Sequence, residues 1–176
     1  AELTAVAPGD AAAIVARLDR LAEHRPAAVR PAIAGVTLRL LELGRGSAPP
    51  TAAEARALTT AGRPAEARKA WDAVAGRAPR DVDLQTEFAE FLSSQTDRAS
   101  ATAAAAKWRE IERASPESSP RWYQARLGPA RSYWQLGDKA HAAQIIELTE
   151  ALHPERGGAA LKAQFDEVRG RIETGR

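Results

Sequence analysis

The apolar residues of the chain recur every three or four positions over most of its length, a spacing that places them on one face of an α-helix. Turn glycines and closing prolines divide this pattern into segments. Gly62 and Pro79 are 17 residues apart, and Gly137 and Pro154 have the same separation. The closing prolines Pro79, Pro116 and Pro154 follow one another at intervals of 37 and 38 residues. A repeated unit of two helices joined by a turn is therefore predicted.

Three such hairpins account for residues 51–154, and they are expected at 51–79, 81–116 and 119–154. In a stack of this kind each hairpin buries its apolar face against a neighbour, so the last hairpin needs a cover. The charged segment 157–173 is expected to be that cover, a C-terminal capping helix. Its apolar residues at helical intervals are Leu161, Phe165, Val168 and Ile172.

Residues 1–46 are expected to form a divergent or capping hairpin, because their two helical patterns lack the glycine and proline spacing of the repeats. The first helix is predicted at 10–24, with Asp10 as its N-cap, and the second at 26–43, with Gly44 as a left-handed C-terminal cap. The expected apolar stripe of the first helix comprises Ile14, Val15, Leu18, Leu21 and Ala22, and that of the second comprises Ile33, Val36, Leu40 and Leu43.

The first helix of the third hairpin contains Gly128 followed by Pro129. Proline removes a backbone donor and crowds the preceding turn, so a kink is predicted at this point. The helix is expected to continue beyond the kink because the apolar pattern resumes at Tyr133.

Composition favours an all-α globular fold. Alanine, a strong helix former, is the commonest residue, and aromatic residues make up only 5% of the chain. No run of about 18 apolar residues is present, so no transmembrane segment is expected. The net charge is +2, with no basic stripe, which argues against nucleic-acid binding.

The source of the chain leaves a compositional trace. Arginine greatly outnumbers lysine and alanine is abundant, which suggests a GC-rich bacterial genome. The chain contains no methionine, which indicates a processed chain or an excised fragment. The opening AELTAVAPGD would suit a mature N-terminus after signal-peptide removal, so an exported, periplasmic or extracellular location is favoured, although a fragment boundary would look the same.

The residue patterns of catalytic, cofactor and metal sites were not found. The chain has no cysteine, and His24, His141 and His153 have no partner at ligand spacing, so no metal site is expected. Glycine patterns that bind nucleotides are missing as well. The chain is therefore expected not to be an enzyme and to need no cofactor. The carboxylate pairs interpreted as solvated helix faces are Glu87 with Glu90 and Asp166 with Glu167.

A small residue stands twelve positions before each closing proline, and a large apolar residue stands eight positions before it. These residues are Ala67, Ala104 and Ala142, and Trp71, Trp108 and Ile146, respectively. The third hairpin adds the turn Leu136-Gly137-Asp138, preceded by Ala130 and Tyr133. In these features residues 51–154 resemble the tetratricopeptide repeat (TPR) family. The chain departs from the family pattern at Pro129, in the second turn, which has no glycine, and in the first hairpin, which lacks an early aromatic residue.

The resemblance implies a right-handed α-solenoid of antiparallel hairpins. It also implies that Trp71 and Trp108 fill the core between hairpins, and we expect no ligand role for either. The implied function is that of a non-catalytic scaffold or adaptor that binds a peptide or protein partner through the concave face, formed by the first helix of each hairpin. The predicted partner-binding residues on that face are Arg56, Thr59, Asp83, Glu87, Glu90, Gln124, Arg131, Trp134 and Gln135.

Two points stay open at the level of sequence. Arg131 and Trp134 either form an interface anchor, or Trp134 packs against the N-terminal turn of the next helix while Arg131 is a solvated charge. Family members that capture a peptide's terminal carboxylate use Lys and Asn at the groove positions, and neither occurs here, so capture of that type is not expected. The alternative function is a structural subunit that self-assembles as a homo-oligomer through the ends of the solenoid.

Overall fold

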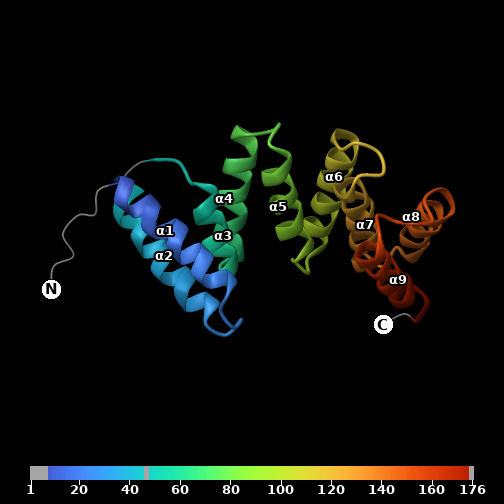
Figure 1. Ribbon diagram of the computed structural model, residues 1–176, viewed down its shortest axis with the longest axis horizontal. Helices are drawn as coiled ribbons and strands as arrows, with labels where there is room; N and C mark the ends of the chain where they lie inside the picture. The colour runs from blue at the N-terminus through green and yellow to red at the C-terminus, as the bar shows by residue number, and fades with distance from the viewer. Residues whose placement is uncertain (1–7, 46–47, 175–176) are drawn as a thin grey trace. The chain divides into compact units, whose positions relative to one another are not determined.

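The computed structural model describes residues 8–45 and 48–174, and within these ranges it contains nine α-helices and no β-strand (Figure 1). Side chains are described for the same ranges except residues 8–12, 19 and 45. The prediction of an all-α fold is confirmed. The chain divides into two compact units, Ala1–Ala78 and Pro79–Arg176.

The first unit contains four helices. They are α1 (Pro8–Glu23), α2 (Arg30–Arg45), α3 (Ala52–Thr60) and α4 (Pro64–Arg77). Within this unit α1 packs on α2, α2 on α3 and α3 on α4 (Figure 1). Thr51 caps α3 by accepting the backbone N–H of Glu54, and Gly62 has the positive φ of 70° that the turn before α4 requires.

The N-terminal hairpin exists, but several of its predicted details are wrong. Helix α2 begins at Arg30, because Pro31 is tolerated only in the first turn of a helix and therefore draws the start towards itself. Gly44 lies inside α2 and has no positive φ, so it is not a left-handed cap. Helix α1 begins at Pro8, two residues before the predicted cap Asp10.

The apolar stripes of α1 and α2 also differ from the prediction. Val36 and Leu43 are 54% and 49% exposed, whereas the buried residues of α2 are Ala34, Thr37 and Leu38. Because α2 packs against both α1 and α3, two neighbours decide its buried face, and a single-stripe pattern does not capture this. In α1 the predicted residue Val15 is buried, but Ile14 and Leu21 are 38% and 42% exposed.

The second unit contains five helices. They are α5 (Val82–Ser93), α6 (Arg98–Ala114), α7 (Pro120–Gln135), α8 (Lys139–Leu152) and α9 (Ala159–Thr174). Helices α5 and α6 form one hairpin, α7 and α8 form the next, and α6 packs on α7 (Figure 1). Side-chain caps start four of these helices, because a hydroxyl or carboxylate oxygen accepts an otherwise unpaired backbone N–H. The capping residues are Asp81, Asp97, Ser119 and Asp138.

Helix α9 covers the last hairpin. Leu161, Phe165 and Val168 are buried in one cluster with apolar residues of α7 and α8, and Ile172 packs on its edge. Apolar side chains of α9 are thus removed from water even though the helix is mostly charged on its other faces.

The crossing alanines Ala67, Ala104 and Ala142 are each 0% exposed, and Trp71 and Trp108 are 2% and 4% exposed. Both tryptophans are therefore core residues, as predicted. A buried indole N–H needs an acceptor, and each of these finds a hydroxyl on the first helix of its own hairpin. Trp71 donates to Thr59 at 3.1 Å, and Trp108 donates to Ser93 at 2.9 Å.

Helix α7 runs unbroken through Gly128 and Pro129. The structure also explains the glycine: a Cβ built on Gly128 would lie 2.3 Å from Cγ of Trp108 and 2.4 Å from two further ring atoms. Trp108 therefore lies directly against the backbone of α7, and only glycine leaves room for it.

Candidate functional site

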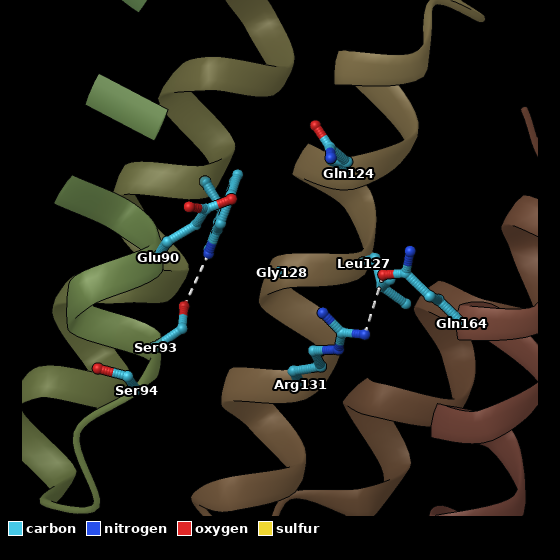
Figure 2. A pocket seen from close by; sticks show the side chains of 9 residues that line it. Glu90, Ser93, Ser94, Gln124, Leu127, Gly128, Arg131 and Gln164 are labelled. Carbon is cyan, nitrogen blue, oxygen red and sulfur yellow. Dashed lines mark hydrogen bonds between the residues drawn. The ribbon is translucent and has the colours of Figure 1, made fainter. Parts of the chain in front are cut away.

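A groove in the second unit is the candidate site. It has a volume of about 370 Å³ and is bordered by α5 and its C-terminal cap, α6, α7 and α9 (Figure 2). Its apolar lining consists of Trp108, Leu127 and Gly128. Its polar lining consists of Glu90, Ser93, Ser94, Gln124, Arg131 and Gln164. A concave site with an apolar base and a few polar groups is the usual form of a ligand pocket.

The base of the groove is held in place by the Trp108 contacts. The Ser93 hydroxyl that accepts the indole N–H of Trp108 donates in turn to the backbone oxygen of Ala89, at 2.8 Å. Because Gly128 lets the indole lie flat on α7, the ring has contacts from α5 on one side and α7 on the other. The apolar base is therefore rigid, which lowers the entropic cost of binding.

Arg131 is half-buried on the α7 wall of the groove. Its Nη2 donates a hydrogen bond to Oε1 of Gln164 on α9, at 3.2 Å (Figure 2). Burial lowers the pKa of Arg131, the Glu167 charge opposes this shift, and the Arg171 charge adds to it. Glu167 itself forms an ion pair with Arg171 at 2.6 Å. The positive charge of Arg131 is thus partly desolvated and has no ion pair of its own among the described side chains.

The other arginines that are buried or half-buried differ from Arg131 in forming ion pairs. Among the side chains that the structure describes, four such arginines each have a carboxylate partner. Their pairs are Arg68 with Asp72, Arg121 with Asp83, Arg126 with Glu112, and Arg156 with Glu150 and Asp166. A cation that leaves water is normally neutralised in this way, so Arg131 is the exception within the described part of the chain.

Glu90 provides the opposite charge on the α5 wall, and Figure 2 shows it across the groove from Arg131. Burial raises the pKa of Glu90, and the neighbouring Glu87 carboxylate raises it further. No ion pair is formed by Glu90 with any of the described side chains. The groove therefore carries one positive and one negative group on facing walls, and neither forms an ion pair with a described side chain.

The structure brings together part of the predicted binding set. Three of the nine residues, Glu90, Gln124 and Arg131, line the groove. Gln135 lies close by, since its amide donates to the backbone oxygen of Ser93 at 3.1 Å.

Trp134 is half-buried, and the guanidinium carbon of Arg171 lies 5.8 Å from its ring centroid. Arg131 is half-buried, so it is not a fully solvated charge. For Trp134 the structure shows the contact with α9, through Arg171, as a cation–π pair.

The remaining predicted residues are not at this groove. Asp83 is exposed and forms an ion pair with Arg121, and Glu87 is half-buried beside Glu90 without lining the groove. Arg56 and Thr59 belong to the first unit, where the hydroxyl of Thr59 accepts the indole N–H of Trp71.

Three polar residues of the groove were missed from sequence. Ser93 and Ser94 stand at the last residue and the C-cap of α5, and Gln164 lies on α9, outside the repeats. The two consecutive serines that follow the apolar residues of α5 are the one sequence signal for polar groups at this place. Hydroxyl groups at a helix end can serve as hydrogen-bond acceptors. No pattern in the sequence brings Gln164 to Arg131.

The histidines have structural contacts. His141 Nδ1 lies 2.6 Å from a carboxylate oxygen of Asp138, and its ring stacks on Tyr133. His153 packs edge-on against Trp122. Among the described residues no group of three or more His, Asp or Glu residues could hold a metal ion, and none of the helices in this part of the chain is long and apolar enough to cross a membrane.

No protein-family model, curated protein or solved structure matches the chain. Membership of the tetratricopeptide repeat family stays a prediction from the residues quoted above.

Proposed function

We propose that this protein is a non-catalytic scaffold that binds a peptide or protein partner, and that its hairpins are of the right-handed TPR-like solenoid type. The recurring crossing alanines, the positive-φ turn glycines and the indole-to-hydroxyl bonds support this class of hairpin. On the second unit the partner surface is the face formed by α5 and α7, the first helices of its two hairpins, and such helices line the concave face in solenoids of this type.

One observation carries the proposal: the groove on the second unit combines an apolar base with a half-buried arginine, Arg131, that has no ion pair among the described side chains. Such a group is costly to maintain when it only serves the fold, because desolvation of a charge lowers stability. A partner that supplies the opposite charges would recover this free energy. Arg131 is central, since it is the most enclosed of the charged groups that line the groove.

A photo-crosslinking experiment tests this function. A benzophenone amino acid is placed at Gln124, which is exposed and lines the groove, and, as the matched control, at Arg98, an exposed residue at the start of α6. Crosslinking in lysate of the source organism is expected to give a discrete heteromeric product from position 124 and not from position 98. Identical products from both positions would contradict a binding role for the groove.

Self-assembly as a structural subunit is the second candidate, and exposed apolar side chains favour it. Large apolar residues are about half exposed or more on α2 and α8. They are Val36, Leu43, Leu148 and Leu152. The C-terminal helix α9 does not contribute exposed apolar residues of this kind, because Leu161, Phe165 and Val168 are buried in the cluster with α7 and α8.

Size-exclusion chromatography with light scattering separates the two candidates. A homo-oligomer that dissociates in the Leu152→Asp variant, and not in the matched exposed variant Glu147→Asp, would favour self-assembly. A chain that stays monomeric at every protein concentration would exclude self-assembly.

A further inference from the structure

The groove contains an electrostatic pattern that specifies its ligand more closely than the proposed function does. Among the described arginines that are buried or half-buried, Arg131 is the one that has no carboxylate partner. Its side chain is oriented by the hydrogen bond to Gln164, so the remaining N–H groups of the guanidinium are available to a ligand in a defined direction. A planar guanidinium recognises a carboxylate through two parallel hydrogen bonds.

Glu90 restricts the ligand further. Its carboxylate lies on the facing wall of the same groove, and like Arg131 it is partly desolvated and has no ion pair with a described side chain. A ligand with several negative charges would be repelled by Glu90, so polyanions such as nucleic acids and phosphorylated groups are disfavoured. A cationic group facing Glu90 would be stabilised.

We propose that the groove binds a short dipolar peptide segment, with its carboxylate at Arg131 and its cationic group facing Glu90. This inference rests on the proposed function and adds the chemistry of the partner. The amides of Gln124 and Gln164 line the same groove and can bond to peptide groups. The volume of about 370 Å³ accommodates a segment of a few residues.

The two charges of the ligand have two possible sources. They are either the free ends of a short peptide or the side chains of an acidic and a basic residue within a longer chain. The probes are therefore unblocked alanine peptides of two to four residues, the same peptides acetylated or amidated at one or both ends, and fully capped peptides in which Glu and Lys are separated by one to three alanines.

Binding is measured on the whole chain by NMR, with the Nε–H signal of Arg131 as the reporter of its own site. The dipolar probes are expected to shift this signal saturably, whereas the fully capped alanine peptides do not. Removing either charge from the probe is expected to weaken binding about ten-fold, the usual effect of one charge-assisted hydrogen bond.

Three variants test the assignment of the charges. Arg131→Gln and Arg131→Lys lack the Nε–H reporter, so binding to every variant is followed by the side-chain amide signals of Gln124 and Gln164, which line the same groove. Arg131→Gln is expected to abolish the preference for a free carboxylate and to leave the preference for a cation. Glu90→Gln is expected to do the reverse, and Arg98→Gln, an exposed control, to change neither. Arg131→Lys keeps the charge but loses the planar fork, so it tests the geometry if Arg131→Gln does not fold.

Several results would overturn the inference. The inference is wrong if capped and dipolar peptides bind equally well, or if inorganic phosphate binds more tightly than the dipolar peptides. It is also wrong if removing the carboxylate from the probe weakens binding while removing the cationic group does not. If no dipolar probe binds while the crosslinking at position 124 captures a partner, the inference fails and the proposed function stands. If neither experiment detects binding, the inference and the proposed function are both wrong.

Discussion

Replacing Gly128 by alanine should destabilise the second unit, although the same change in most helices is stabilising. Alanine gains about 1 kcal/mol over glycine in a helix interior. At this position the added Cβ would lie 2.3 Å from Cγ and 2.4 Å from Cδ1 and Cδ2 of Trp108. Ordinary contacts between carbon atoms are about 3.5–4.0 Å, so the indole or α7 must move by more than about 1 Å.

The size of the effect follows from two opposing contributions. Overpacking of a core costs about 1–3 kcal/mol, and this site belongs to the upper part of that range because three ring atoms of a buried residue are involved. After subtracting the helix contribution, we expect a net loss of about 1–2 kcal/mol. With a urea m-value of about 2 kcal/mol/M, the unfolding midpoint should fall by about 0.5–1 M.

Urea unfolding followed by tryptophan fluorescence measures this change, since Trp108, Trp122 and Trp134 all lie in the second unit. Gly170→Ala is the matched control, because it lies in α9 and a Cβ there has no neighbour within 4 Å. The control should raise the midpoint. If both variants raise it equally, Trp108 does not lie against Gly128 and the packing argument for the groove base is refuted.

The other predictions concern the core, a buried ion pair and a helix cap. Trp108→Ala should lower the free energy of unfolding by about 3–5 kcal/mol in urea titration, and Ser93→Ala by about 1–3 kcal/mol because it leaves the indole N–H without its acceptor. Arg156→Ala should lower the free energy of unfolding by about 2–3 kcal/mol, again measured by urea titration. This loss is smaller than that for a fully buried ion pair because the two carboxylate partners of Arg156 keep some access to water. Hydrogen bonds from the side chain and backbone of Ser100 lower the pKa of Asp97, so the stability from this cap is present above the unfolded-state pKa and is lost as the pH falls below about 4. Asp97→Asn should therefore show a smaller drop in melting temperature between neutral and acidic pH, whereas an unchanged drop would contradict the role of the cap.

The repeated hairpins could be predicted from sequence because their signals are local. A glycine is needed where φ is positive, as at Gly62 and Gly137, and a small residue is needed where two helices cross. Ala104 and Trp108 could thus be assigned to the core from their distance to Pro116, and both are buried.

The N-terminal hairpin shows where this approach fails. Val36 and Leu43 fit an apolar stripe but are about half exposed, because α2 packs on two neighbours and its buried face is shared between them. A pattern within one helix carries no information on how many partners that helix has.

The groove could be predicted only in part, for a related reason. The positions of Glu90, Gln124 and Arg131 along their helices predicted that all three belong to the binding surface, and all three line the groove. It could not identify Gln164, which lies 33 residues from Arg131 in the chain and meets it only after α9 has folded over the last hairpin. That Arg131 forms no ion pair with a described side chain is likewise a property of the folded structure.

The turn between α8 and α9 has a consequence for proteolysis. Arg156 has a positive φ and is followed by Gly157 and Gly158, so by its backbone it is the kind of loop that trypsin cuts readily. Its side chain, however, is 9% exposed and forms ion pairs with Glu150 and Asp166, at 2.6 and 2.8 Å. The protease must insert an extended arginine into its specificity pocket, so cleavage here requires the ion-pair cluster to open first. This bond is therefore a built-in reporter of local unfolding, and its cleavage rate measures how often the ion pairs of Arg156 with Glu150 and Asp166 open.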